Sequence, residues 1–585
     1  MSYKLNTREA NAKGEPLLKA LSRLLPLMKG EGPKVLFAFG CIVVSSATAL
    51  TGPVIIGHVV DTYIPTGDYA GVLTWTGLLL GVYLIGLVAG YFQTRTMGGV
   101  GRRILFNLRN AIFTKLQELP IAFFNQNKSG DLISRINNDT DKLNQFFAQA
   151  LMQFLSNSFL ILGAGTLLLT LNFRLGLAAL TPAAVVLILT RVISPLVRRT
   201  SFKSLQTLGG LSGEIQESLA NFKVIVAFNR LDYFRKKFDE ANAANYHASV
   251  RAGIASNVFI PLYGLAYNLG QLIVLAYGIT LIANGELTTG LLIGFLLYVN
   301  NFYNPLRQLA TVWASLQLAL AGLDRISEVL AMQSDMAVIE APHTGSDTVL
   351  ELRDVSFHYP DGKTVLDHVS ISLERGKTYA LIGPTGGGKT TTASLMARLY
   401  DPTSGTVLLD GKDIRAYSPE DRAKKIGFIL QEPFLFTGTV RDNIVYGNAE
   451  YISQSDEALT KTLADAGLSA LLSRFDEGLE TPVTASGDSI SLGQKQLIAF
   501  MRAALRQPEV LILDEATANI DTVTEQLLEV ILKNLPATTT KVIIAHRLNT
   551  IDDADEIFFI NAGEVTRAGS MQNAVDMLLN GRMAS

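Results

Sequence analysis

The chain has 585 residues, too many for one ordinary hydrophobic core. Apolar residues make up 48% and charged residues 17%, which argues against both a wholly soluble enzyme and a disordered chain. The net charge of −2 conceals a division, because residues 1–330 hold 28 Lys and Arg against 17 Asp and Glu, and the remainder holds 22 against 35. A net +11 beside a net −13 indicates two halves in two environments.

The first 34 residues are predicted to form a cytoplasmic segment. Within them, Pro16–Lys29 places leucines at helical spacing between lysines and arginines. That pattern suits a helix lying flat on the membrane surface, and it equally suits an ordinary solvated helix start.

Residues 35–325 are predicted to form an all-α membrane domain. A helix needs about 20 mostly apolar residues to cross a bilayer. A single shorter run would also suit a buried globular helix, but no soluble core holds so many long apolar helices together. Six stretches reach or approach the required length: 35–60, 71–94, 143–173, 175–197, 252–285 and 287–306.

The connections between these stretches differ in charge. The short links contain a single basic residue, Arg174, whereas residues 95–142 hold eight Lys and Arg and residues 191–251 hold ten. Because basic residues favour the cytoplasmic side, both termini and both long links are predicted to be cytoplasmic. The long links lack strand patterning, so we expect the helices to continue into them. The expected location is a bacterial inner (plasma) membrane.

After a linker at 326–345, residues 346–585 alternate strand-like runs with turns, which predicts an α/β domain. A strand at Thr378–Ile382 leads into a glycine-rich loop and then a helix, the context of a phosphate-binding loop. The backbone N–H groups of such a loop approach phosphate oxygens, aided by the helix N-terminus. This pattern predicts ATP and Mg²⁺ as cofactors, bound by Gly383, Pro384, Thr385, Gly386, Gly387, Gly388, Lys389, Thr390 and Thr391.

Within this loop Lys389 is expected to reach the β- and γ-phosphates, and Thr390 to ligate Mg²⁺. A second strand ends at Asp514-Glu515, where Asp514 would hold the metal and Glu515 would polarise the attacking water. A third strand, Lys541–Ala545, ends at His546, for which we favour a γ-phosphate contact.

The order of these motifs resembles the ATP-binding cassette (ABC) family over about 230 residues. The resemblance implies that Tyr359 stacks on adenine, that Gln431 joins Mg²⁺ to the membrane-domain contact, that Asp521 crosses the dimer and that His546 is the switch histidine. The membrane half resembles the six-helix exporter type with domain-swapped helices. Its coupling loops would be FFNQNKSGDLISRINND and ESLANFKVIVAFNR. The spans exclude a soluble family member that acts on nucleic acid.

One motif departs from the family pattern. The signature LSGGQ is represented by Ile490 followed by Ser491, Leu492, Gly493 and Gln494, with leucine in place of the first glycine. Glycine there would allow close approach to phosphate and unusual φ angles, which leucine restricts. The resemblance therefore predicts a heterodimer with one degenerate ATP site, whose partner chain has an intact signature and lacks the catalytic glutamate. The alternatives are a homodimeric lipid flippase or multidrug exporter and, less favoured, an ATP-gated channel or regulatory subunit.

The spans also carry uncharged polar and aromatic side chains. They would suit a cavity for an amphipathic drug, lipid or peptide, or they would join helices to one another. The second interpretation is favoured for any single member of this set: Gln145, Gln149, Gln153, Asn157, Tyr263, Tyr267, Asn268, Gln271, Tyr298, Asn300, Asn301, Tyr303 and Asn304.

Overall fold

The computed structural model describes residues 3–5, 25–342, 345, 347–360, 362–484, 490–514, 522–544 and 554–580. Its internal contacts divide the chain into two compact units. The helical unit comprises Asn6–Gln117 and Ser129–Ala331. The α/β unit comprises Met1–Leu5, Glu118–Lys128 and Met332–Ser585, so it is assembled from three separate segments.

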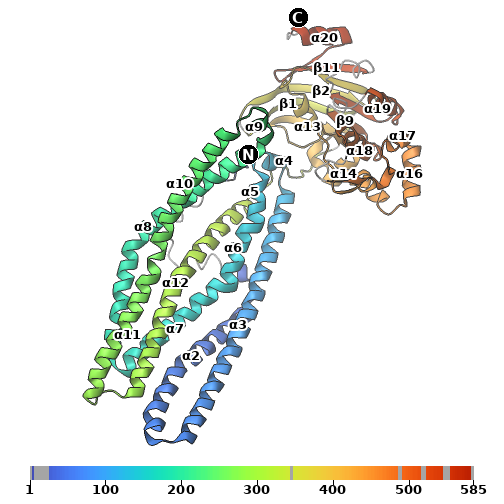
Figure 1. Cartoon of the computed structure of the whole chain (residues 1–585). Helices are drawn as coiled ribbons and strands as arrows, with labels where there is room; N and C mark the ends of the chain where they lie inside the picture. The colour runs from blue at the N-terminus through green and yellow to red at the C-terminus, as the bar shows by residue number, and fades with distance from the viewer. Residues whose placement is uncertain are drawn as a thin grey trace. The chain divides into compact units, whose positions relative to one another are not determined.

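The helical unit consists of long helices joined by tight turns (Figure 1). Gly67, in the left-handed conformation at φ 66°, ends the first long helix, and Asn172 and Thr288 accept hydrogen bonds from backbone N–H groups at the starts of two others. The long helices are α2 (Gly32–Thr66), α3 (Tyr69–Glu118), α7 (Leu151–Leu171), α8 (Phe173–Ala220), α10 (Leu231–Asn257), α11 (Phe259–Ala283) and α12 (Thr289–Leu330).

Short helical segments complete this unit. Two turns of wider π geometry, η2 (Arg135–Asp139) and η3 (Phe146–Ala150), interrupt the helix that leads into α7. The other short segments are η1 (Leu25–Met28), α5 (Ser129–Ser134), α6 (Thr140–Gln145) and α9 (Phe222–Ala227).

Five helical stretches among the described residues are long and apolar enough to cross a membrane: 32–66, 69–118, 129–171, 173–220 and 231–283. They account for the first five predicted spans. The sixth, 287–306, lies in α12 and is not one of the five. Three asparagines and a proline near its C-terminal end, Asn300, Asn301, Asn304 and Pro305, reduce its apolar character. A crossing by α12 stays a prediction.

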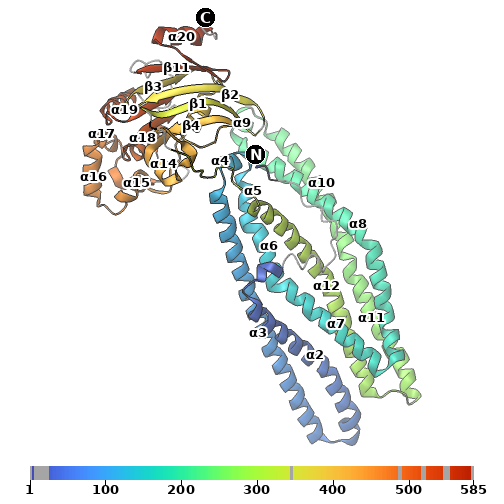
Figure 2. The same ribbon diagram turned by 180° about the vertical axis from the view of Figure 1, so that it is seen from behind.

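The long helices continue well beyond the predicted spans, as expected: α3 has 50 residues and α8 has 48. Helix α8 packs on α10 and α11, while α12 packs on α2, α7 and α11 (Figures 1 and 2). Helix α12 continues to Leu330, so residues 326–330, predicted as linker, are helical. The reason is that Ile326 and Val329 are buried, so their packing extends the helix.

An ion cluster fixes the start of the third spanning stretch to the end of α12. The guanidinium of Arg135 is almost fully buried and pairs with Asp131 at 3.0 Å and with Glu328 at 2.9 Å. Arg325 pairs with Asp131 and, at 3.3 Å, with Asp139. A buried guanidinium needs such partners, because leaving one charge uncompensated there is strongly destabilising.

The α/β unit contains two large sheets (Figure 2). The six-stranded sheet has the order β12-β11-β3-β10-β9-β6, in which only β12 runs antiparallel to its neighbour. Its strands are β3 (Thr378–Ile382), β6 (Ile426–Ile429), β9 (Val510–Asp514), β10 (Thr540–Ile544), β11 (Glu556–Asn561) and β12 (Glu564–Arg567).

The second large sheet is antiparallel, with the order β2-β1-β4-β5. Its strands are β1 (Thr348–His358), β2 (Thr364–Glu374), β4 (Ser404–Leu409) and β5 (Lys412–Asp413). A small pair joins β7 (Gly438–Thr439) to β8 (Pro482–Val483).

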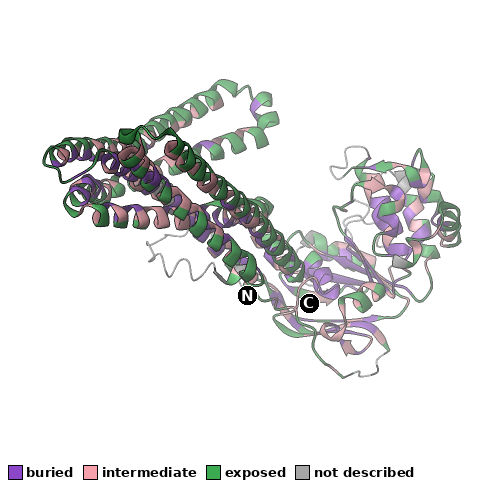
Figure 3. Cartoon of the chain, turned by 90° about the horizontal axis from the view of Figure 1, so that it is seen from below, coloured by how far each residue is buried: buried purple, intermediate pink, exposed green. Residues whose placement is uncertain are grey.

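Helices complete this unit. The strands bury most of their side chains, whereas the long helices of the other unit are largely exposed, as lipid-facing surfaces would be (Figure 3). The helices are α4 (Ile121–Gln126), α13 (Lys389–Met396), η4 (Ile414–Ala416), α14 (Pro419–Lys425), α15 (Val440–Val445), η5 (Ala449–Tyr451), α16 (Asp456–Asp465), α17 (Ser469–Leu472), η6 (Gly478–Glu480), α18 (Leu492–Ala504), α19 (Thr522–Asn534) and α20 (Met571–Asn580). Of these helices, α13, α14, α18 and α20 pack against the large sheets. The predicted fold class, a helical membrane domain followed by an α/β domain, is confirmed.

Candidate functional site

The glycine-rich loop connects the end of β3 to the start of α13. Gly383 has φ +144°, and a Cβ atom there would lie 2.0 Å from the Ile560 carbonyl oxygen. Gly388 has φ +116°, and a Cβ atom there would lie 2.8 Å from the Leu366 side chain. Only glycine combines a positive φ with the absence of a Cβ atom, so the backbone here forms a concave loop that a side chain would fill.

Lys389 is buried at the start of α13 and folds back over this loop. Its Nζ donates to the carbonyl oxygens of Gly383 at 2.9 Å and Pro384 at 3.1 Å. The ammonium and the N-terminal N–H groups of α13 thus lie beside the same loop, and both favour a bound anion. The loop therefore fits the phosphate groups of a nucleotide.

Oxygen ligands lie next to the lysine. Asp514 is buried at the end of β9, and β10 alone separates β9 from β3. Thr390 Oγ1 donates to Asp514 Oδ1 at 3.4 Å. A hydroxyl and a carboxylate at this spacing fit Mg²⁺, which prefers oxygen ligands. Gln431 follows β6, the strand beside β9, and its side chain is exposed.

An aromatic cluster lies on the other side of the loop. The Tyr359 hydroxyl lies 3.0 Å from Thr391 Oγ1, and its ring meets those of Phe357 and Tyr400 edge-on, with centroids 5.0 and 5.5 Å away. Tyr359 is half-buried, as an aromatic side chain that packs on protein and also meets a ligand would be. The predicted adenine contact is thus placed beside the helix that carries Lys389.

The aromatic cluster also reaches α4, in the first predicted coupling loop. Asn125 Nδ2 donates to the Tyr400 hydroxyl at 2.7 Å, and burial raises the pKa of that phenol above its ordinary value, so it stays neutral. Sequence reasoning missed this contact, since nothing local connects residues 275 positions apart.

The N-terminal residues Tyr3 and Leu5 pack beside α4, where each is 3% exposed. Tyr3 N donates to Gln126 Oε1 and Leu5 N to Asn127 Oδ1, both at 2.9 Å. The Tyr3 hydroxyl accepts from Asp335 N at 3.0 Å. This N-terminal clip, residues 3–5, was also missed, because three residues carry no usable periodicity.

Three predicted site residues lie outside the described residues: Glu515, Asp521 and His546. Their neighbours are described. Asp514 and Ile544 are the last residues of β9 and β10 and pair with each other in the parallel ladder. Both strands therefore end at the same edge of the sheet, next to the phosphate loop.

The segment that corresponds to the signature, with leucine in place of its first glycine, lies at the start of α18. Ser491 Oγ accepts from Gln494 N at 3.2 Å, and Gln494 Oε1 accepts from Ser491 N at 2.9 Å, which forms a capping box. Leu492 follows as the first helical residue, with its side chain 38% exposed. Neither Leu492 nor Gly493 has positive φ, so the backbone here is that of an ordinary helix start. What leucine adds is bulk at the helix N-terminus.

Most polar side chains of the spans with a described partner contact another part of the helical bundle. The Tyr298 hydroxyl donates to the Leu50 carbonyl at 2.6 Å, and that of Tyr303 to the Ala179 carbonyl at 2.8 Å. Asn300 Nδ2 donates to the Tyr267 hydroxyl at 3.1 Å, and Asn157 Nδ2 to Gln308 Oε1 at 3.3 Å. These contacts support helix joining for these members of the set.

The fold and the site together define the class: a membrane-embedded P-loop ATPase. The ABC transporter transmembrane region matches residues 35–306, and the ABC transporter ATPase domain matches residues 366–518. The chain is 36% identical to an uncharacterised ABC transporter ATP-binding protein of Bacillus subtilis, YfiC, over 90% of this chain and 87% of that one.

Two further relatives carry functional names. A fatty acid ABC transporter ATP-binding/permease protein of Mycobacterium bovis is 32% identical over 86% of this chain and 79% of its own. A multidrug resistance ABC transporter ATP-binding and permease protein of Lactococcus lactis is 31% identical over 85% and 84%. The chain belongs to the ABC transporter family, as a multi-pass half-transporter of the exporter type whose ATPase domain is coupled to transport.

Proposed function

We propose that this chain is one half of a dimeric exporter that uses ATP to move an amphipathic drug, lipid or peptide out of the cell. The observation that carries the proposal is the phosphate loop at the end of β3 in a chain that also holds five candidate spans. The names of the Mycobacterium and Lactococcus relatives support a fatty acid or a drug as cargo.

In this proposal the site residues divide the work on ATP. Tyr359 stacks on adenine, Lys389 and the loop N–H groups neutralise the phosphates, and Thr390, Asp514 and Gln431 hold Mg²⁺ when it is bound. The metal supplies charge neutralisation at the β- and γ-phosphates. Glu515 orients and polarises the attacking water, and His546 contacts the γ-phosphate. Asp521 belongs to the loop that crosses the dimer.

Coupling in this proposal runs through α4. Closure of two ATPase domains on ATP would move α4, because Asn125 is bonded to Tyr400 and Tyr400 packs on Tyr359. A ligand shifts a conformational equilibrium only through differential contacts, and this chain of contacts supplies one. Hydrolysis would then reset the transporter.

Inverted membrane vesicles that contain the complex test the proposal. We expect ATP-dependent accumulation of a fluorescent amphipathic dye, and none with the Lys389→Ala variant. A channel would let the dye equilibrate without accumulating. ATP hydrolysis without dye accumulation would therefore favour the alternative of an ATP-gated channel or a regulatory subunit.

We further propose that the dimer is heterodimeric. A composite ATP site takes its phosphate loop from one subunit and its signature from the other. Leu492 places a bulky exposed side chain at the N-terminus of α18, where a phosphate would approach. A partner chain with an intact signature and no catalytic glutamate would complete one competent site. The homodimeric alternative is favoured by the ordinary helical backbone of Leu492 and by its intact capping box.

The purified chain alone separates these two arrangements. As a heterodimer subunit, it should hydrolyse ATP at least about tenfold more slowly than the complex, since the signature backbone N–H groups act as preorganised donors. Leu492→Gly in the chain alone should then raise that rate. Full substrate-stimulated ATPase activity of the unmodified chain alone would contradict the heterodimer.

The membrane and the orientation of the chain in it complete the proposal. We propose an inner (plasma) membrane location with both termini cytoplasmic, because the basic residues gather in the long links. Protease accessibility of a C-terminal tag in inverted vesicles, but not in intact cells, checks this orientation.

A further inference from the structure

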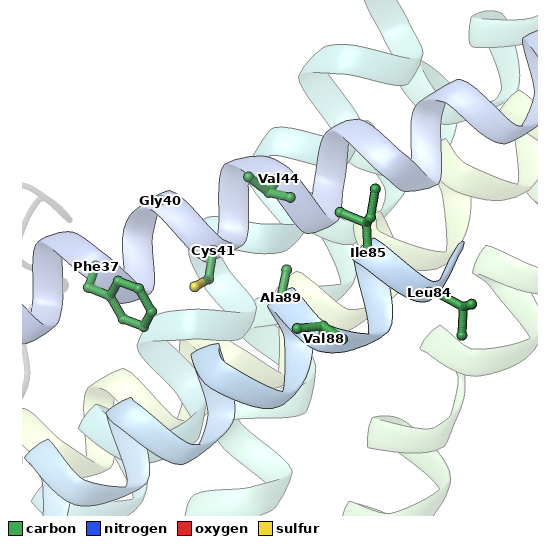
Figure 4. A pocket seen from close by; sticks show the side chains of 8 residues that line it. All are labelled: Phe37, Gly40, Cys41, Val44, Leu84, Ile85, Val88 and Ala89. Atoms are coloured by element: carbon green, nitrogen blue, oxygen red, sulfur yellow. The ribbon is translucent and has the colours of Figure 1, made fainter. Parts of the chain in front are cut away.

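A crevice of about 620 Å³ lies between α2 and α3 and is lined by apolar side chains. Phe37 and Cys41 project from α2 toward α3, and Ala89 projects from α3 toward α2 (Figure 4). Small residues create the space: a Cβ atom on Gly40 would meet no heavy atom within 4 Å. Only 6% of the residues in the most apolar stretch of α3 are buried by the described part of the chain, so this side is open there.

A second hollow of about 490 Å³ continues the crevice, because Phe37 lines both. Its lining is basic and includes Lys34, Arg95 and Arg103. Lys34 and Arg95 are the first charged residues beyond the uncharged stretches 35–60 and 71–94. They therefore mark the same predicted membrane edge on the two helices, and the hollow forms the mouth of the crevice at that edge.

The mouth has an excess of positive charge. Glu31 pairs with Lys34 at 2.7 Å and with Arg103 at 3.1 Å. Arg95 Nη1 donates to the Tyr91 hydroxyl at 3.4 Å, and the guanidinium lies 6.0 Å from the centre of that ring. In the described part of the chain, three cations thus face one carboxylate, at the depth where lipid phosphates lie.

We propose that this crevice binds one anionic phospholipid, with an acyl chain between α2 and α3 and the phosphate at Lys34, Arg95 and Arg103. From Arg95 to Leu84 the α3 face extends about 16 Å, which suits a chain lying along the helix. Guanidinium groups match phosphate oxygens in a fork of two parallel N–H···O bonds. The site is independent of the cargo, so it stands whether or not the exported substrate is a lipid.

The first experiment is native mass spectrometry of the intact full-length complex in detergent. It is titrated with phosphatidylglycerol or with phosphatidylcholine of the same acyl chains. We expect tighter retention of phosphatidylglycerol, and Arg95→Gln should reduce its affinity about fivefold while leaving phosphatidylcholine unchanged. Equal retention of the two lipids, or an unchanged preference in Arg95→Gln, would overturn the proposal, as would stronger binding of a free fatty acid.

A matched pair of glycine variants tests the apolar part. Gly40→Leu should fill the crevice and abolish retention of both lipids. Gly81→Leu on α3 should not, since its Cβ position is equally open and it lines neither hollow. If Gly40→Leu instead dissociates the dimer in light scattering, a second subunit covers the crevice and the lipid assignment is wrong.

Cys41 supplies a second readout, because it is the only cysteine in the chain and lines the crevice. Phosphatidylglycerol should slow its alkylation by N-ethylmaleimide more than phosphatidylcholine does. As a control, Leu78→Cys combined with Cys41→Ala puts the thiol at a 51% exposed position of α3, where the two lipids should act alike. Equal slowing at Cys41 would also overturn the proposal.

Discussion

The phosphate loop and the membrane helices use polar groups in opposite ways. In the loop, Gly383 to Thr390 are consecutive, and their backbone forms the concave surface, against which Ile560 and Leu366 pack. In the helical unit, single polar side chains such as Tyr298 and Tyr303 of α12 donate to carbonyls on two other helices, Leu50 on α2 and Ala179 on α8. The phosphate loop is therefore encoded locally, whereas the partners of these polar side chains depend on how the helices pack.

The strongest effect is expected from a change in the phosphate loop. Lys389→Ala should reduce ATP hydrolysis at least about 100-fold, because it removes the cation beside the phosphates. Lys424→Ala, an exposed lysine on α14, is the matched control and should leave the rate unchanged. Phosphate release by the purified complex measures both. A Lys389→Ala rate within a few fold of the unmodified protein would contradict the assignment.

The next effect is expected from a change where two membrane helices, α2 and α12, pack closely. A Cβ atom on Gly290 would lie 2.0 Å from the Gly57 carbonyl oxygen and 2.7 Å from the Asp61 carboxylate. Gly290→Ala should therefore force α2 and α12 apart at a cost of about 1–3 kcal/mol. Thermal unfolding of the detergent-solubilised protein should show the loss. Gly77→Ala on α3, where the added Cβ meets nothing within 4 Å, should not lower the melting temperature.

A smaller effect tests the link from the nucleotide site to α4. Tyr400→Phe removes the hydroxyl that accepts from Asn125 at 2.7 Å and keeps the ring. One hydrogen bond is worth about 1 kcal/mol, so the ratio of dye transported to ATP hydrolysed should fall about fivefold. Tyr417→Phe removes a comparable bond, to the Leu409 carbonyl at 2.9 Å, away from α4. An equal change in both variants would show a general loss of stability instead.

The smallest effect concerns acid stability of the α/β unit. Burial tends to raise the pKa of Glu509, but hydrogen bonds from Lys425 and Arg375 outweigh it and hold the pKa below its ordinary range. This stabilisation is present above the unfolded-state pKa of about 4.3 and is lost as pH falls through the lowered folded value. Glu509→Gln should thus lower the free energy of unfolding at pH 7 by about 1 kcal/mol or less, which a lower melting temperature would reveal. The difference should vanish near pH 3, and its persistence there would contradict the ionic origin.

Features that depend on neighbouring residues could be predicted from the sequence, whereas contacts between distant segments could not. The loop and Asp514 were predictable because glycine, lysine and a strand-ending carboxylate serve local backbone geometry. The contacts of Asn125 with Tyr400 and of Tyr3 with Gln126 were not, because they join segments 275 and 123 residues apart. The π turns η2 and η3 also left no mark in the hydrophobic period. At Leu492 the sequence showed the substitution but not that the position has an ordinary helical backbone.

The N-terminal clip has a consequence for the order of assembly during synthesis. Tyr3 and Leu5 leave the ribosome before their partners, α4 and Asp335, and the last of these is translated only after the membrane helices. The α/β unit therefore cannot be completed until insertion is nearly finished. A ribosome stalled between residues 130 and 330 would carry a buried-type tyrosine and α4 without the surface that covers them. Quality-control proteases would meet that exposed surface in every chain whose insertion fails.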